Sequence, residues 1–175
     1  MSNTYFHTQE ARPNKLSKAV ICKRDDAWLG EAYYFWYDES DADHWGNSSK
    51  KRTGKYQVYK AEIDKSDVLD TVFNEDHYLF WLNQIEKIAK NFIKKTHIKP
   101  TLKELNEYMA ERGLPDEITG VQFQDLHTNP DFNLVQPIQY QYKKVTFSYK
   151  KRIQIAVYNY DIVTTFAFLK QESCI

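Results

Sequence analysis

The chain has 175 residues, of which 42% are hydrophobic, and its 24 lysines and arginines balance its 24 aspartates and glutamates. This length suits one globular domain with its own core, and the net charge of zero gives no sign of a nucleic-acid or membrane partner. The two cysteines, Cys22 and Cys174, form neither a disulfide framework nor a zinc motif, and no stretch reaches the roughly 18 apolar residues of a membrane span. We therefore expect a soluble, cytoplasmic protein, or one delivered into the cytoplasm of a target cell.

The first sixty residues are predicted to alternate between short strands and short helices. In chain order we expect a strand over 3–8, a short helix over 13–21, an aromatic strand over 33–37, a small helix over 40–45 and a strand over 56–63. Ser40 is the expected cap of the small helix. Residues 46–54 are rich in glycine, serine and lysine, which is typical of a solvated loop.

The middle of the chain is predicted to be helical. Apolar residues recur at the spacing of one helix face from Tyr78 to Ile93, and two lysines followed by Pro100 indicate where that helix ends. Thr101 and Glu104 have the spacing of a capping box for a second helix, which Gly113 is expected to close. These helices form an insertion over about 76–113 within a single domain that spans 1–175.

The last third of the chain is strand-like. Alternating, β-branched and aromatic residues predict strands over 120–123, 138–142, 145–149, 153–158 and 163–169. The expected fold class is therefore α+β, with helices inserted between the strands of a mostly antiparallel sheet.

Three short segments, far apart in sequence, carry the strongest functional signal. They are Tyr5 to Thr8, Leu29 to Phe35 with Trp45 behind it, and Ile153 to Tyr158. Together they resemble the His-Tyr-Glu pattern of ADP-ribosyltransferases of the diphtheria-toxin and poly(ADP-ribose) polymerase type. The resemblance implies an ADP-ribosyltransferase-like fold with a split β-sheet core, and it implies NAD as the substrate.

The resemblance also implies a role for individual residues. His7 would bind the ribose nearest the adenine, and the backbone of Thr8 would hold the nicotinamide amide. Tyr34 and Trp45 would stack on the nicotinamide ring, and Arg24 would bind the diphosphate. On this assignment the catalytic residues are His7, Tyr34 and Gln154, and the residues that bind NAD are His7, Thr8, Arg24, Tyr34 and Trp45.

The third motif departs from the family pattern, because the family has Glu where this chain has Gln154. A Gln side chain can accept the same hydrogen bond from a ribose hydroxyl, but it brings no negative charge to an oxocarbenium-like sugar. No Glu occurs from Ile118 to Gln171, so no neighbouring glutamate can replace it. Relatives without the Glu generally make single transfers or are inactive, so chain elongation is the least expected activity.

Each motif also has a plain structural interpretation. His7 could be an ordinary strand-edge histidine, the aromatic residues of 33–36 could fill the core of a strand, and Gln154 could be a polar strand residue. The charge pair at Lys23 and Arg24 could simply be solvated. The sequence has no glycine-rich phosphate loop, so neither a Rossmann nor a P-loop site is expected. It has no His-Glu-x-x-His motif, so metal chemistry is not expected.

Three functional hypotheses follow. The first is a mono-ADP-ribosyltransferase that uses NAD to modify a protein or nucleic acid, acting as a toxin, a phage-related effector or an antiviral defence protein. An antitoxin or inhibitor protein would then be a further partner. The second is a catalytically impaired module of the same fold that binds a nucleotide or a partner. The third is a nucleic-acid-binding α+β protein without an NAD site, since basic and aromatic residues interleave over 139–152.

Overall fold

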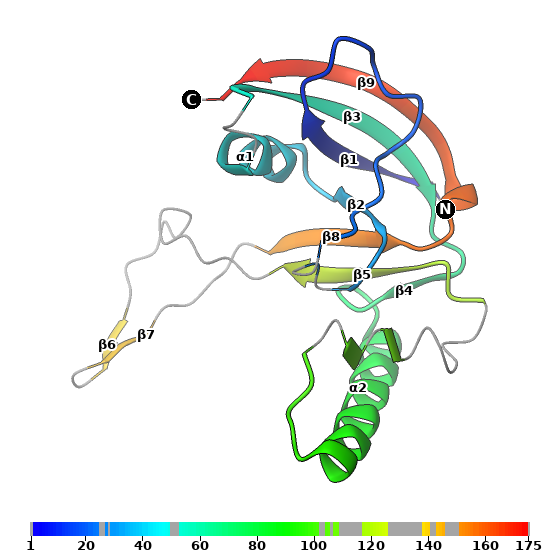
Figure 1. The fold of residues 1–175 in the computed structure, drawn as a ribbon, viewed down its shortest axis with the longest axis vertical. Coiled ribbons are helices and arrows are strands. Elements are labelled where there is room, and N and C mark those ends of the chain that lie inside the picture. Colours follow the sequence, from blue (N-terminus) through cyan, green and yellow to red (C-terminus); the bar gives the residue numbers. More distant parts are fainter. Residues whose placement is uncertain are drawn as a thin grey trace.

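A seven-stranded sheet forms the body of the protein (Figure 1). The computed structural model describes residues 2–24, 27, 29–49, 53–101, 104–105, 107–108, 117–125, 138–140, 143–145 and 151–174. Along the sheet the strands lie in the order β4 (Val68–Asp70), β5 (Gly120–Asp125), β8 (Arg152–Val157), β2 (Tyr33–Trp36), β1 (Ser2–Glu10), β3 (Lys55–Asp64) and β9 (Val163–Ser173). Neighbouring strands are antiparallel except β4 and β5, which are parallel.

The predicted α+β class with a mostly antiparallel sheet is confirmed. Two further short strands, β6 (Ile138–Tyr140) and β7 (Lys143–Val145), pair with each other outside the large sheet. They overlap the expected strands over 138–142 and 145–149, whose remaining residues lie outside the described part of the chain. β4 was not anticipated, because three residues are too few to show a strand period.

The helical elements whose bounds the described residues define are α1 (Glu39–Ser49), α2 (Glu75–Thr96) and the 3-10 turn η2 (Tyr160–Ile162). α2 begins after Asn74, whose side chain accepts a hydrogen bond from the His77 N–H, and it ends at His97, which has a left-handed φ of 58°. In the described part of the chain, no helix has the length and apolar character needed to cross a membrane.

The capping box predicted after α2 is present. Thr101 Oγ1 accepts a hydrogen bond from the Glu104 N–H at 3.2 Å, and Glu104 Oε2 accepts one from the Thr101 N–H at 2.7 Å. Residues 104–105 and 107–108 are helical. The helix end predicted at Gly113 lies outside the described residues.

The helix predicted over 13–21 is wrong, since these residues form bends and irregular backbone without helical hydrogen bonding. Three of their backbone N–H groups donate to side chains of other segments: Leu16 to Tyr59, Ala19 to Tyr160 and Val20 to His7. Because these donors are satisfied from outside the segment, they do not form a helical ladder.

The prediction for α1 was too short at both ends. Asp38, not Ser40, caps the helix, since its Oδ1 accepts a hydrogen bond from the Ser40 N–H at 2.8 Å. Residues 46–49, predicted as loop, belong to the helix. Gly46 allows α1 to lie close to β3, because a Cβ at this position would overlap the ring of Tyr56.

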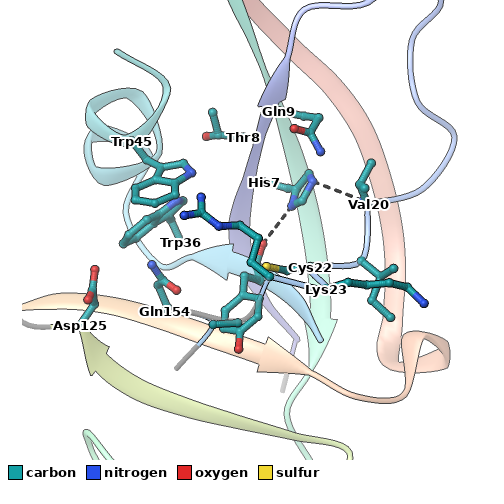
Figure 2. Close-up of a pocket in the computed structure, with 14 residues that line it drawn as sticks. His7, Thr8, Gln9, Val20, Cys22, Lys23, Trp36, Trp45, Asp125 and Gln154 are labelled. Carbon is teal, nitrogen blue, oxygen red and sulfur yellow. Dashed lines mark hydrogen bonds between the residues drawn. The ribbon is translucent and has the colours of Figure 1, made fainter. Parts of the chain in front are cut away.

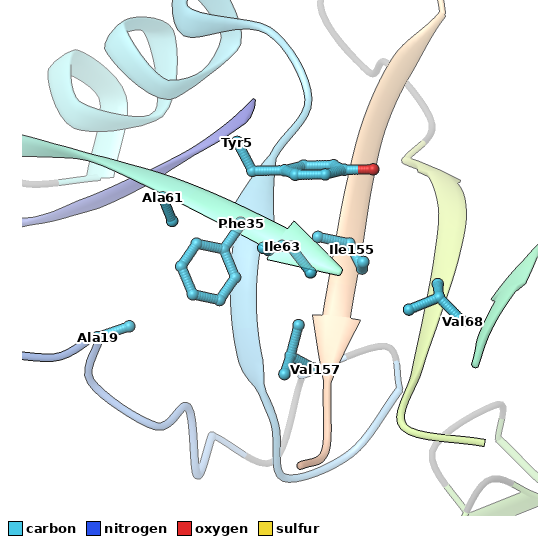
Figure 3. Close-up of a cluster of buried hydrophobic side chains, with 8 residues drawn as sticks. All are labelled: Tyr5, Ala19, Phe35, Ala61, Ile63, Val68, Ile155 and Val157. Carbon is cyan, nitrogen blue, oxygen red and sulfur yellow. The ribbon is translucent and has the colours of Figure 1, made fainter. Parts of the chain in front are cut away.

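The sheet buries side chains on both faces. Tyr5, Phe35, Ile63, Ile155 and Val157 belong to one cluster, which gathers where β1, β2, β3 and β8 meet (Figure 3). Successive strand residues point to opposite faces. The residues that follow Phe35 and Ile155 in sequence therefore face the other side, where α1 packs beside Trp36.

A polar network in the sheet connects β1 to β5 and β4. The hydroxyl of the buried Tyr5 donates to Gln122 Oε1, and Gln122 Nε2 donates to Asp70 Oδ1 at 2.9 Å. Lys65 Nζ binds Asp70 Oδ2 at 2.8 Å, and two backbone N–H groups of the following turn also donate to Oδ1. Burial raises the pKa of the Asp70 carboxyl, but Lys65 and the backbone donors outweigh it, so the pKa lies below its ordinary value.

Replacing Asp70 with Asn should lower the free energy of unfolding at neutral pH by about 1–3 kcal/mol, because Lys65 and the backbone donors lose their charged acceptor. The folded-state pKa is depressed, so this stabilisation is present above the ordinary carboxyl pKa and is lost as pH falls through the folded value. Urea unfolding of both proteins, at neutral pH and at about pH 2–3, should therefore show the difference shrinking in acid. Asp67→Asn, at an exposed turn position nearby, is the control. An undiminished difference in acid would contradict this account of Asp70.

Candidate functional site

A pocket of about 380 Å³ opens where the sheet divides. β1 and β2 share one register pair, Phe6 with Trp36, whereas β1 pairs with β3 along its whole length and β2 pairs with β8 along its whole length. Beyond Phe6 and Trp36 the two strands diverge (Figure 1). The volume is in the range of small-molecule sites in proteins.

All six residues assigned to the site from sequence line this pocket (Figure 2). They come from different segments of the chain: His7 and Thr8 from β1, Arg24 from the connection after it, Tyr34 from β2, Trp45 from α1 and Gln154 from β8. The structure therefore brings together residues from both ends of the chain, from His7 to Gln154.

His7 connects three segments of the pocket wall. Its Nδ1 donates to the Tyr34 carbonyl at 2.9 Å, and its Nε2 accepts from the Val20 N–H at 3.4 Å. Because a carbonyl only accepts and an N–H only donates, these partners assign the neutral tautomer with its proton on Nδ1. A ribose contact through the ring of His7 would have to replace one of these two hydrogen bonds.

Tyr34 fixes the loop that precedes β2. Its hydroxyl accepts a hydrogen bond from the Leu29 N–H at 3.0 Å and donates to the Gly30 carbonyl at 2.9 Å. Gly30 has a φ of 77°, a left-handed conformation that glycine adopts without strain. Burial raises the pKa of the Tyr34 hydroxyl, although the hydrogen bond from Leu29 opposes this effect. The residue therefore stays a neutral hydrogen-bonding anchor.

The aromatic wall of the pocket contains two tryptophans. Trp45 of α1 and Trp36 of β2 have ring centroids 6.0 Å apart and planes inclined at 48°. The sequence assigned ring stacking to Tyr34 and Trp45, yet Trp45 contacts Trp36, while Tyr34 packs edge-on against Phe123. Trp36 was not anticipated here, although its two-residue offset from Tyr34 places both side chains on the same face of β2.

A carboxylate that was not anticipated from sequence also lines the pocket. Asp125 ends β5 and lies opposite Arg152 of β8, and its Oδ2 is 2.7 Å from Arg152 Nη2. Burial raises the pKa of the Asp125 carboxyl above its ordinary value, and the adjacent Arg152 guanidinium offsets only part of this rise. The signal that could have identified Asp125 is its place two residues after the strand predicted over 120–123, where that strand continues to Asp125.

The remaining predicted residues have different surroundings. Thr8 is buried, and its hydroxyl donates to the Ala42 carbonyl at 2.8 Å, so its side chain ties β1 to α1. Arg24 is exposed at the pocket. The adjacent Lys23 pairs with Glu31 at 3.0 Å, both side chains being largely solvated. Arg24 therefore supplies positive charge where solvent reaches the pocket.

Comparison with known proteins adds no relative: no protein-family model matches the chain, and no curated protein or solved structure matches it.

Replacing Tyr34 with Phe should lower the free energy of unfolding by about 1–2 kcal/mol, because the Leu29 N–H and the Gly30 carbonyl lose their partner. Tyr33→Phe is the matched control, since Tyr33 lies next to it on β2 but faces Tyr160 on the other side of the sheet. Urea denaturation of both variants measures the difference. Equal effects of the two substitutions would show that the Tyr34 hydroxyl does not anchor the loop.

Proposed function

We propose that this protein is a mono-ADP-ribosyltransferase that cleaves NAD and transfers ADP-ribose to a macromolecule, either a protein or a nucleic acid. The observation that carries this proposal is the convergence of the six residues of the resemblance in one pocket. They were chosen from motifs in separate segments, and strand or loop residues selected for unrelated reasons would not be expected to share one cavity.

The strand order also supports the proposal. The strands that carry the three motifs, β1, β2 and β8, are neighbours in the sheet, and the pocket lies where β1 separates from β2. A split, mostly antiparallel sheet with the motif strands at the split is the arrangement that the ADP-ribosyltransferase resemblance implies. The finer assignment to that fold is part of this proposal.

The lining of the pocket has the chemical groups that the proposed reaction needs. NAD cleavage breaks the bond between the ribose C1′ and the nicotinamide nitrogen, and the electron pair leaves with nicotinamide. The indoles of Trp36 and Trp45 offer π faces that attract a pyridinium cation. Arg24 can pair with a phosphate oxygen, and Gln154 can bind a ribose hydroxyl.

The biological setting that we propose follows from the same resemblance. A small enzyme of this type would serve as a toxin, a phage-related effector or a defence protein, and it would be paired with an antitoxin or inhibitor protein. The acceptor would dock at the open side of the pocket, where the sugar becomes accessible once nicotinamide has left.

A second candidate is a nucleotide-binding module of the same fold that does not turn NAD over. Two observations favour it. Gln154 carries no charge, and both ring nitrogens of His7 already have backbone partners. This candidate shares the pocket with the first one, so the two differ in nicotinamide release and not in NAD binding.

The first test is nicotinamide release from NAD by the purified protein, with and without cell lysate, followed by mass spectrometry of labelled acceptors. Release with ADP-ribose on a macromolecule would support the transferase. Binding without release would favour the module, and the absence of both would overturn both candidates.

Replacing Trp45 with Ala should weaken NAD binding about tenfold or more, because stacking and cation–π attraction together contribute about 1–3 kcal/mol. Isothermal titration calorimetry measures the affinity, and a thermal melt confirms that the variant is folded. Tyr78→Ala, at an exposed aromatic position on α2, is the control and should bind NAD normally. Unchanged affinity in Trp45→Ala would place the nicotinamide away from α1.

A further inference from the structure

Asp125 is the one carboxylate among the described residues that line the pocket. Its side chain is 13% exposed, and one of its oxygens, Oδ2, is bonded to Arg152. Its other oxygen, Oδ1, has no hydrogen-bond partner among the described residues. The carboxylate therefore has one oxygen fixed by the protein and one available to a ligand.

Arg152 holds Asp125 from a buried position. The Arg152 side chain is 9% exposed, it does not line the pocket, and its guanidinium carbon lies 4.6 Å from the centre of the Trp36 ring. Replacing a buried ion pair by apolar side chains is often neutral or stabilising, because desolvation offsets the attraction between the charges. A gain in stability is therefore a weak explanation for the Asp125–Arg152 ion pair. Orientation of the Asp125 carboxylate toward the pocket explains the ion pair better.

Asp125 and Gln154 project from neighbouring strands on the same face of the sheet. Asp125 is opposite Arg152, and Gln154 is opposite Phe123, so Asp125 and Gln154 are diagonal neighbours across β5 and β8. Residues at such diagonal positions on neighbouring strands are about 7–8 Å apart. In Figure 2 both side chains extend toward the rings of Trp36 and Trp45. One sugar ring can therefore contact both.

We propose that Asp125, and not the residue at the third motif position, supplies the negative charge that stabilises the sugar cation. Gln154 then binds a ribose hydroxyl, and Arg152 acts as the positioning residue of Asp125. This inference rests on the proposed NAD cleavage, and it explains how a chain with Gln at the third motif position can perform that reaction.

The step is balanced in charge and atoms. The bond between C1′ and the nicotinamide nitrogen breaks, its electron pair neutralises the pyridinium ring, and the positive charge moves to the sugar. An oxygen of water or of the acceptor forms the new bond to C1′ and releases its proton to solvent. Asp125 stays ionised and forms no covalent bond, and its contribution is the attraction between its charge and the oxocarbenium-like sugar.

The test compares nicotinamide release and NAD affinity in the wild type, Asp125→Asn, Asp125→Glu and Gln154→Ala. Asp125→Asn should lower kcat by about 10²–10³-fold with little change in NAD affinity, because the charge acts on the transition state. Asp125→Glu, which keeps the charge, should recover part of the activity. Gln154→Ala should cause a smaller loss of kcat than Asp125→Asn. Asp67→Asn, outside the pocket, should behave like the wild type.

Removing the charge of Asp125 leaves Arg152 buried without its partner, so a folding control is needed. The double variant Asp125→Asn/Arg152→Gln removes both charges and should fold while remaining as inactive as the single variant. Arg152→Gln alone keeps the carboxylate but frees its orientation, so it should lower kcat more than it changes KM. A structural role of Arg152 would instead lower the melting temperature without this split.

The outcomes distinguish a failure of the proposed role of Asp125 from a failure of the proposed transferase activity. A wild-type protein that releases nicotinamide, with full release retained by a folded Asp125→Asn, would overturn the role of Asp125 and leave the transferase intact. A wild-type protein that binds NAD without releasing nicotinamide would overturn the transferase and this inference together. Loss of release in Gln154→Ala alone would assign the essential contact to Gln154.

Discussion

The divergence of β1 and β2 is the constraint on which the pocket depends. Two neighbouring strands normally satisfy each other's backbone groups, but here the ladder stops after the pair Phe6 and Trp36. The ring of His7 takes over part of that task, because it binds the Tyr34 carbonyl on one side and the Val20 N–H on the other. The sheet can therefore open without leaving these two backbone groups unsatisfied, and the connection after β1 is held at the edge of the opening.

The elements that sequence predicted well have local signals. α2 has an apolar face, an Asn cap and a left-handed residue at its end, and the long strands β3 and β9 have alternating or β-branched residues. The failures depend on distant residues. The 13–21 segment has helical spacing, but side chains from the sheet bind its backbone. Residues 46–49 have loop composition, yet packing of α1 against Tyr56 keeps them helical.

The site shows the same division between local and long-range information. Each motif is a short local pattern, so the sequence alone identifies its residues, and these residues face one pocket. Trp36 and Asp125 reach the pocket through the register of β2, β5 and β8, which no single segment encodes. The pocket lining therefore includes the Asp125 carboxylate, which is paired with a buried arginine, two indoles and the solvent-exposed Arg24. Such a lining suits a ligand that is cationic and planar in one part and anionic in another.

The parallel pairing of β4 with β5 has a topological consequence for the helical insertion. A chain that leaves one strand and returns to its neighbour in the same direction must first travel back along the sheet, and a hairpin turn cannot do this. α2 lies in the connection between these two strands, and a connection longer than a hairpin turn is obligatory here. Its length is not fixed by the sheet, however, and α2 extends away from β4 on the side remote from β1 (Figure 1). This part of the chain could change in size over evolution while the strands that frame the pocket keep their register.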